Sequence, residues 1–338
     1  MIAVGVDAHK HEHAVCVLDA VGRVIGECTI SATRQGYAEL ARWIGQLPDT
    51  VVVGIEGAGS YGAGLCEFLL AAGICVVEVD RPKRTQRRRN GKSDRIDARL
   101  AAKRVLADDG LASPRRAGAR QAIAALLVGY RSCISERTRL LNELQALHTT
   151  APIALREQLG SGNGKQLVRR VTKQRRRPSG NQREQILLEV LRDLAQRTLD
   201  LTRRADTYRA KLDRLIRELD QTLLDEPGIG AISAAKLLAC DPQRLSSEAA
   251  FARCNGTAPL PASSGQTTRH RLSRGGDRQA NNAIHTIALT RARCDTQTRA
   301  YLERRINEGK TRREAMRSLK RHLSRSLYKR LITIDLTT

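Results

Sequence analysis

The sequence predicts a mixed α/β domain at the N-terminal end of the chain and a mostly α-helical structure for the rest. Over residues 1–110, short segments rich in valine and isoleucine alternate with helical segments, which is typical of an α/β domain. From residue 113 onwards, apolar residues recur every three or four positions, which is the spacing of amphipathic helices. A chain of 338 residues is expected to form two or three domains.

The order of elements in the first part indicates a ribonuclease-H-like fold. Three strands come first, followed by a helix, a strand, a helix, a strand and a closing helix. In that fold the first and fourth strands are parallel neighbours, so their carboxyl ends meet at one edge of the sheet. The expected strands cover residues 2–7, 13–18, 24–30, 51–56 and 74–79, and the expected helices cover residues 35–47, 60–72 and 93–108.

Two long helices are expected in the middle of the chain. Apolar residues follow a 4-3 spacing in residues 113–150 and again in residues 184–224, where it lasts for more than four heptads. This spacing predicts a coiled-coil hairpin or a coil between subunits, with an ordinary helical bundle as the alternative. Residues 160–182 are rich in Gly, Lys and Arg, and we interpret them as a mobile basic loop without secondary structure.

The last part is expected to form a third, mostly helical domain. Pro227-Gly228-Ile229-Gly230 lies between two apolar helical stretches. This pattern is typical of a helix-hairpin-helix, whose backbone amides can meet a phosphate, and a plain helix-turn-helix corner is the alternative. The expected domains are therefore residues 1–112, 113–222 and 223–338.

The distribution of charge indicates a nucleic-acid partner. The formal net charge is +24, yet residues 1–80 hold 4 Lys or Arg against 10 Asp or Glu, whereas residues 111–338 hold 44 against 21. An acidic first part and a basic remainder suggest an active-site domain joined to a body that holds a polyanion. A basic protein of the ribosomal type is the alternative. Because only 3% of residues are aromatic, phosphate contacts rather than base stacking should dominate binding.

The sequence shows no sign of export or of a membrane span. The eight cysteines include no C-x-x-C pair and are expected to be reduced and mostly buried. There is no signal-peptide pattern and no apolar run of about 18 residues. We therefore expect a cytoplasmic protein without a membrane partner.

Four acidic residues, called here the acidic tetrad, define the candidate metal site: Asp7, Glu56, Asp94 and Asp97. The first two each end an apolar strand, and the other two open a helix three positions apart, so that they share one face. Two like charges about 4 Å apart repel by about 4 kcal/mol at an effective dielectric of about 20, so the tetrad must protonate, separate or hold cations. One or two Mg²⁺ ions would remove this conflict and polarise a scissile phosphate. Four unrelated surface carboxylates are the alternative.

Three histidines follow the first acid at alternate positions. We expect His9, His11 and His13 to lie on the solvent side of a turn, with His9 or Lys10 near a phosphate. A dedicated site for a transition metal is the less favoured interpretation of this pattern.

Two basic tracts are candidates for phosphate contacts. Residues 81–92 hold seven Lys or Arg in twelve positions directly before the acidic pair, and a solvated charged face is the alternative. A second tract follows Ser263-Ser264-Gly265, whose turn could present an alcohol to a phosphate, although such loops are common. The candidate nucleic-acid-binding residues are Lys83, Arg84, Arg87, Arg88, Arg89, Lys92, Arg269, Arg271 and Arg274.

Together these segments resemble those of the DEDD-type insertion-sequence transposases, a family of bridge-RNA-guided recombinases related to Piv-type DNA invertases. The motifs occur in family order over nearly the whole chain. The sequence departs from the family pattern at residues 256–259, where Gly-Leu-x-Pro is frequent, and at Gln279 and Asn281 in the basic tract. The matching motifs are Gly5-Val6-Asp7-Ala8-His9-Lys10, Gly54-Ile55-Glu56-Gly57-Ala58-Gly59-Ser60-Tyr61, Lys92-Ser93-Asp94-Arg95-Ile96-Asp97-Ala98, Pro227-Gly228-Ile229-Gly230, and Ser264-Gly265 with the basic tract.

The resemblance implies a RuvC-like N-terminal domain whose acidic tetrad binds Mg²⁺, a coiled-coil middle and a C-terminal transposase domain. It implies a nucleophilic serine at Ser264, with Ser263 as the alternative, that carries out phosphodiester transesterification on donor and target DNA. It further implies a structured bridge RNA as guide and a homo-oligomer that assembles from dimers to a tetramer in a bacterial nucleoid. The tetrad and the serine would then form composite sites between subunits.

Two other functions fit part of the sequence. A metal-dependent endonuclease or Holliday-junction resolvase would use water as the nucleophile, so it would need the tetrad but not the serine. A non-catalytic protein that only binds RNA or DNA would need neither. If an RNA supplies the sites by base pairing, the protein sequence does not encode them.

Overall fold

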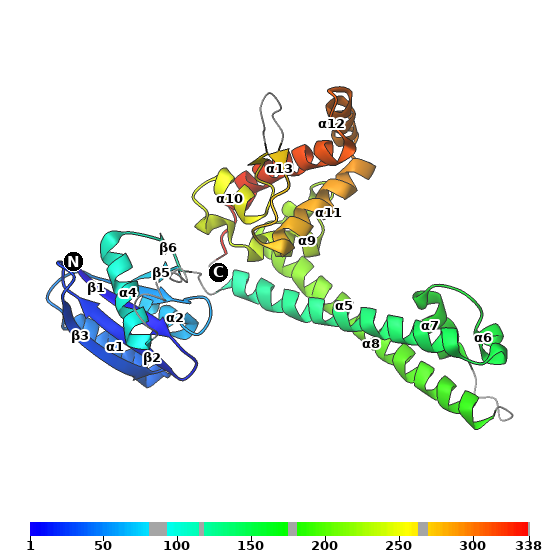
Figure 1. Cartoon of the computed structure of the whole chain (residues 1–338), viewed down its shortest axis with the longest axis horizontal. Helices are drawn as coiled ribbons and strands as arrows, with labels where there is room; N and C mark the ends of the chain where they lie inside the picture. The colour runs from blue at the N-terminus through cyan, green and yellow to red at the C-terminus, as the bar shows by residue number, and fades with distance from the viewer. Residues whose placement is uncertain (81–92, 115–117, 175–180, 263–269, 337–338) are drawn as a thin grey trace. The chain divides into compact units, whose positions relative to one another are not determined.

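Residues 1–80, 93–114, 118–174, 181–262 and 270–336 are described by a computed structural model. Contacts divide the chain into two compact units, Met1–Ala117 and Gly118–Thr338, each with its own hydrophobic cores (Figure 1). Of the expected domain boundaries, the one at residue 112 lies near the division between the units and the one at residue 222 lies inside the second unit. None of the described helices is both long enough and apolar enough to cross a membrane.

The first unit is built on a mixed six-stranded sheet with the strand order β3-β2-β1-β4-β5-β6. β1 pairs with β2 in antiparallel and with β4 in parallel orientation, so the predicted parallel pairing of the first and fourth strands is confirmed. This arrangement is compatible with the ribonuclease-H-like order expected from the sequence. The strands are β1 (Ile2–Ala8), β2 (Glu12–Leu18), β3 (Val24–Ser31), β4 (Val51–Glu56), β5 (Cys75–Val79) and the short β6 (Leu111–Ala112).

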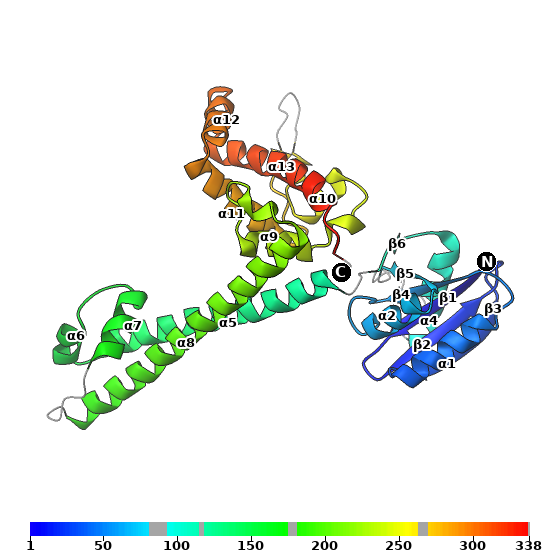
Figure 2. The ribbon, with the colours of Figure 1, turned by 180° about the vertical axis from the view of Figure 1, so that it is seen from behind.

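Helices cover both faces of this sheet, as Figures 1 and 2 show from opposite sides. Side chains of a strand alternate between the two faces. Accordingly, Ile2, Val4 and Val6 of β1 pack in one core with residues of the helices α1 and α2, whereas Ala3 packs in a second core with residues of α4. The helices of this unit are α1 (Arg34–Gly45), α2 (Ala63–Ala71) and α4 (Asp94–Ala107).

Two glycines allow α4 to lie very close to the sheet. Gly5 on β1 and Gly54 on β4 are register partners. A Cβ atom at Gly5 would lie 2.1 Å from the carbonyl oxygen of Ala98 and 2.2 Å from the amide nitrogen of Ala102. A Cβ atom at Gly54 would lie 2.4 Å from Cγ2 of Val105. Since any larger residue would push the helix away, these glycines set the distance between α4 and the strand ends.

The long helices predicted for the middle of the chain are α5 (Ala119–Thr150) and α8 (Gln182–Leu219), which pack against each other. A Cβ atom at Gly129 of α5 would lie 2.6 Å from the ring of Tyr208 of α8, so a small residue is needed at this contact. Arg197 forms an ion pair with Glu136 across the same pair of helices at 3.6 Å. A coiled-coil geometry for this pair stays a prediction.

The expectation that residues 160–182 form a loop without secondary structure is wrong for part of this segment. Residues Gly164–Lys173 form α7, which follows the short helix α6 (Ile153–Leu159). Asn163 begins α7 with a capping box that involves Gln166. The apolar face of α7 is buried in a core with residues of α5 and α8. The sequence pattern does not reveal this face because Lys and Arg dominate the segment. The face consists of Leu167, Val168 and Val171.

The C-terminal part of the second unit surrounds one apolar core, to which the ends of α5 and α8 also contribute. Pro227-Gly228-Ile229-Gly230 joins a short 3₁₀ turn to α9, and Gly228 takes the left-handed conformation with φ +79°. A helix-hairpin-helix here stays a prediction. The elements are the 3₁₀ turns η1 (Leu223–Asp225) and η2 (Pro242–Arg244), the helices α9 (Ala231–Ala239), α10 (Glu248–Cys254), α11 (Arg278–Cys294), α12 (Thr296–Asn307) and α13 (Arg312–Leu331), and the paired strands β7 (Leu260–Pro261) and β8 (His270–Arg271).

Candidate metal centre

Two acids of the tetrad lie side by side at the ends of parallel strands. Asp7 near the end of β1 is the register partner of Glu56 at the end of β4. Both residues are buried, with exposed fractions of 7% and 6%. Each lies two residues after a glycine that faces α4, and strand alternation therefore sends both carboxylates to the α4 face of the sheet.

The other two acids come from the start of α4. Ser93 is the N-cap, Asp94 is the first helical residue and Asp97 lies in the same first turn. Asp97 is buried, whereas the Asp94 side chain is half exposed. The N-terminal end of a helix favours negative charge, so the first turn of α4 is a suitable position for both acids.

A histidine brings the strand and the helix together. Nε2 of His9 lies 3.1 Å from Oδ2 of Asp7 and 3.3 Å from Oδ1 of Asp94. These three side chains each offer one ligand atom within 4.8 Å of the others, which is a suitable arrangement for a metal ion. In the part of the chain that the structure describes, neither Glu56 nor Asp97 belongs to such a group. The acidic tetrad as a complete set of metal ligands therefore stays a prediction.

The electrostatics of this site disfavour an isolated charge on Asp7. Burial raises the pKa of the Asp7 carboxyl, and the neighbouring charges of Asp97 and Asp94 raise this pKa further. The interaction with His9 lowers the same pKa. A cation between these carboxylates would offset both the desolvation and the repulsion, so the local environment favours the binding of one.

The donor set fits a hard divalent cation. Carboxylate oxygens are the preferred ligands of Mg²⁺ and Mn²⁺, and an imidazole nitrogen is tolerated by Mn²⁺. Beside the cluster lies a pocket of about 220 Å³, which is large enough for bound water or a phosphate oxygen. It is lined by His9, Glu12, Ala14, Thr29, Ser93, Asp94 and Arg95.

Sequence reasoning missed the position of His9 in this cluster. The expectation was that all three histidines lie on the solvent side of a turn, with His9 or Lys10 near a phosphate, but β1 ends at Ala8 and the turn places His9 beside Asp7. The expectation for His13 is wrong. This residue is fully buried, and its ring stacks on Tyr37 with a centroid distance of 5.8 Å. Burial also lowers the pKa of His13.

Most of the other candidate residues belong to the two basic tracts and the serine pair. Two basic residues of the second tract are described, and both Arg271 in β8 and Arg274 after it are exposed. The others lie outside the described residues: Lys83, Arg84, Arg87, Arg88, Arg89, Lys92, Ser263, Ser264 and Arg269.

Two segments of the chain match known protein families. Residues 4–151 match the DEDD transposase domain of the IS110 family, described as a transposase. Residues 220–303 match a second family, described as "Transposase IS116/IS110/IS902 family". The first match contains the whole acidic tetrad, and the second contains Ser263 and Ser264.

One curated relative is an insertion-element protein of Mycobacterium paratuberculosis, named "Insertion element IS900 uncharacterized 42 kDa protein". It is 30% identical to this chain over 148 residues, which are 41% of this chain and 36% of the relative. The match to this chain thus spans about a third of the length of the relative.

Proposed function

We propose, from the two IS110-family transposase domains that this chain carries, that it is an insertion-sequence transposase that cuts and rejoins DNA. The observation that carries this proposal is the position of the acids. The family match covers the segment in which Asp7 and Glu56 are register partners and in which Asp94 lies within reach of the same cation as Asp7.

In the proposed reaction, the acidic tetrad holds divalent ions, with Mg²⁺ as the expected species. When bound, such ions polarise the scissile phosphate and stabilise the oxygens that attack and leave. The residues themselves supply the ligands and fix their position. Asp7 and Glu56 are held by the sheet, and Asp94 and Asp97 are held by the first turn of α4. The close contact of α4 with Gly5 supports this arrangement.

The proposed nucleophile is Ser264, with Ser263 as the alternative. Its hydroxyl oxygen would form a bond to phosphorus while the bond from phosphorus to one DNA oxygen breaks. The serine proton would pass to a base, and the departing DNA oxygen would take up a proton and leave as a hydroxyl. This step conserves the phosphodiester energy in a protein–DNA bond, so that a second strand can attack later. Support for the serine comes from the match of residues 220–303 and from the motif order in the sequence.

The proposed partners are donor and target DNA, a structured bridge RNA and further copies of the chain in a tetramer. The formal net charge of +24 supports a polyanionic partner. The long helices α5 and α8 offer extended surfaces for contact between copies. The RNA and the tetramer rest on the resemblance of the motifs to the recombinase family.

A covalent-adduct experiment tests the proposed function. Purified protein is incubated with its flanking noncoding RNA, Mg²⁺, and donor and target DNA, and protein–DNA adducts are separated on a denaturing gel. The adduct should be absent in Ser264→Ala and in Asp7→Ala, and present in Glu67→Gln, a control for an exposed acid on α2.

Three other outcomes would replace this proposal. An adduct that survives Ser264→Ala moves the nucleophile elsewhere. Cleavage that persists in Ser264→Ala without any adduct identifies a nuclease or junction resolvase that uses water. If Asp94→Ala changes nothing except affinity, the protein is a non-catalytic binder.

A further inference from the structure

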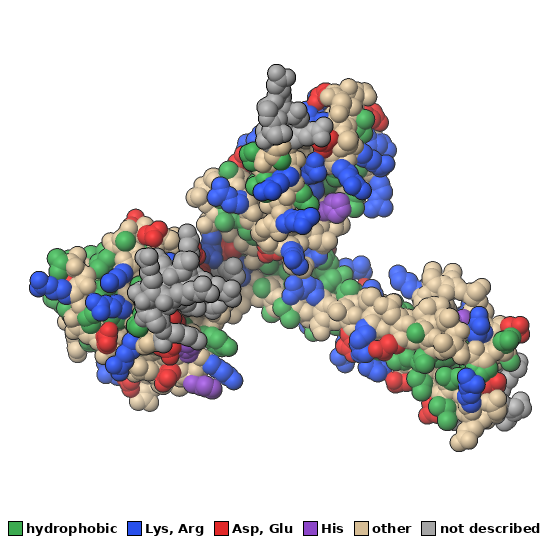
Figure 3. Space-filling model, viewed as in Figure 1, with side chains coloured by type: hydrophobic (Ala, Val, Ile, Leu, Met, Phe, Trp, Pro, Cys, Tyr) green, Lys and Arg blue, Asp and Glu red, His purple; other side chains and the backbone are tan. Residues whose placement is uncertain are grey.

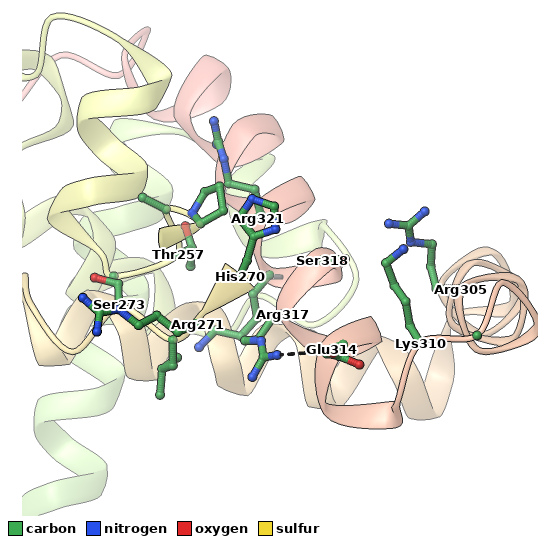
Figure 4. A pocket seen from close by; sticks show the side chains of 16 residues that line it. Thr257, His270, Arg271, Ser273, Arg305, Lys310, Glu314, Arg317, Ser318 and Arg321 are labelled. Atoms are coloured by element: carbon green, nitrogen blue, oxygen red, sulfur yellow. Dashed lines mark ion pairs between the residues drawn. The ribbon is translucent and has the colours of Figure 1, made fainter. Parts of the chain in front are cut away.

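The C-terminal part of the second unit contains a pocket of about 640 Å³. One side is formed by a face of α13, and the turn between α12 and α13 closes one end. Residues 256–259 and 270–273 form the opposite side. Figure 4 shows Arg305 at the end of α12 and Lys310 in the α12–α13 turn at one end of the pocket, whereas Thr257 and Arg271 lie at the other side.

The lining of this pocket is strongly basic. It holds six Lys or Arg side chains and one carboxylate, that of Glu314. Further basic side chains gather over α11 and α12 on the same part of the molecule (Figure 3). A concave surface of one charge sign concentrates the electric field, so it attracts an anion more strongly than a flat surface does. The six cations are Arg271, Arg305, Lys310, Arg317, Lys320 and Arg321.

Lys320 is the most deeply placed of these cations. It is 8% exposed, and its Nζ donates a hydrogen bond to Oδ1 of Asn281 at 3.0 Å. Among the described residues, no carboxylate forms an ion pair with Lys320. Burying an ammonium group with only a neutral partner costs free energy, and an anion in the pocket would offset that cost. Burial also lowers the pKa of Lys320.

The arginines of the pocket keep unused donors. Arg321 donates to Glu248 through Nη2 at 2.9 Å, but its Nη1 is buried and has no partner in the described structure. Arg305 pairs with Glu308 at 2.5 Å through Nη1, and its Nε is likewise buried without a described partner. Buried donors without acceptors are rare in proteins, so a small movement of these two arginines towards an anion in the pocket would satisfy both atoms.

A buried polar network holds the wall of the pocket in place. Asn255 is fully buried, accepts a hydrogen bond from the amide of Thr257 at 3.1 Å and donates to Ser324 of α13 at 2.8 Å. Asn281 donates to the carbonyl of Asn255 at 2.7 Å and accepts from Lys320. The same network therefore positions both the 256–259 loop and the buried ammonium, and the pocket is formed before any ligand binds.

We propose that this pocket binds a backbone phosphodiester of a nucleic-acid strand, with the Lys320 ammonium as a donor to its oxygens. A phosphodiester carries a single negative charge, which would pair with the Lys320 ammonium, and it has several oxygens that accept hydrogen bonds. Arg271 and Lys310, at opposite sides of the pocket, can contact the phosphates before and after it. The site is built from the second unit alone and requires neither the acidic tetrad nor a metal ion.

Equilibrium binding without metal tests this proposal. Fluorescence anisotropy of labelled single-stranded oligonucleotides is measured with the full chain in EDTA over a range of salt concentrations. Lys320→Met should weaken binding by about tenfold, because a hydrogen bond to a charged group is worth roughly that factor. The slope of log affinity against log salt should fall by roughly one phosphate contact. Lys329→Met removes an exposed charge from the same helix outside the pocket and is the matched control.

A second variant keeps the test valid if Lys320→Met does not fold. Arg271→Gln removes an exposed charge from β8, and it should also weaken binding more than Lys329→Met does. DNA and RNA of the same sequence are used in parallel arms, and the arm that loses affinity identifies the strand that occupies the pocket. If Lys320→Met, shown to be folded by its thermal unfolding, and Arg271→Gln both match the Lys329→Met control on both strands, the proposal is wrong. Because no cleavage is measured, this result is independent of the adduct experiment.

Discussion

At the scale of single residues, each candidate site contains a buried ionisable group whose burial disfavours its charged form: an acid in one site and a base in the other. Asp7 is a buried acid near two other acids, and its pKa is raised mainly by burial. Lys320 is a buried base without a carboxylate partner among the described residues, and its pKa is lowered by burial. In both cases the protein keeps a charge where solvation is poor, which is typical of sites that bind an ion of the opposite sign.

The lowered pKa of Lys320 predicts a pH dependence of nucleic-acid binding. Only the protonated ammonium binds a phosphate, so the affinity of the wild type should fall as the pH rises through this pKa. The fall should begin at a lower pH than for an ordinary lysine. The nearby His285 does not account for this decline. Burial and the charge of Lys320 both lower the pKa of His285, so His285 stays neutral over this alkaline range. Anisotropy titrations in metal-free buffer should show the decline in the wild type. The Lys320→Met variant should lack it, and a decline of the same size in both proteins would contradict the assignment.

At the scale of elements, the contact between α4 and the sheet decides whether the acids meet. The strand register sets the spacing between Asp7 and Glu56, but the approach of Asp94 and Asp97 depends on how closely α4 lies over Gly5. The contact between α4 and the sheet therefore determines how closely Asp94 and Asp97 approach Asp7 and Glu56.

Replacing Gly5 by alanine should separate the two halves of the site. The new methyl group would lie 2.1 Å from the carbonyl oxygen of Ala98, so α4 must move. We expect a loss of about 1–3 kcal/mol in the free energy of unfolding, as for overpacked cores, together with weaker metal binding. Denaturant unfolding and calorimetry measure the two effects. Gly45→Ala, which meets no atom within 4 Å, is the control and should lower neither the stability nor the metal affinity. Unchanged metal binding in Gly5→Ala would contradict the role of this contact.

The elements also show what the sequence could and could not predict. The strands β1 to β5 could be predicted because valine and isoleucine mark them and because β1 and β4 each carry an acid at or near the end. The two-residue strand β6 has no such signal. Residues 164–173 were not recognised as a helix, because Lys and Arg surround a short apolar face that is recognisable only once α5 and α8 cover it. Likewise, the place of His9 depends on the turn after β1, and the basic pocket depends on how α13 packs against residues 256–259, neither of which is encoded in local spacing.

At the scale of the whole molecule, the chain joins a unit with an acidic cluster to a unit with a basic pocket. The transposase match over residues 4–151 contains the acids and continues into the second unit, and the match over residues 220–303 includes part of the pocket lining. This division of labour suits a reaction in which one part activates a phosphate and the other holds the strand. The first of these roles depends on the acids binding a cation together.

Calorimetric titration of Mn²⁺ into the full chain tests that central claim most directly, because Mn²⁺ accepts the same oxygen ligands as Mg²⁺. The wild type should bind the ion. Asp7→Asn and Asp94→Asn should each weaken binding by at least about tenfold, since even residues that only support a metal ligand cost about that much when they are lost. Glu67→Gln, an exposed acid on α2, should bind like the wild type. Equal affinity of the wild type and Asp7→Asn would contradict the account.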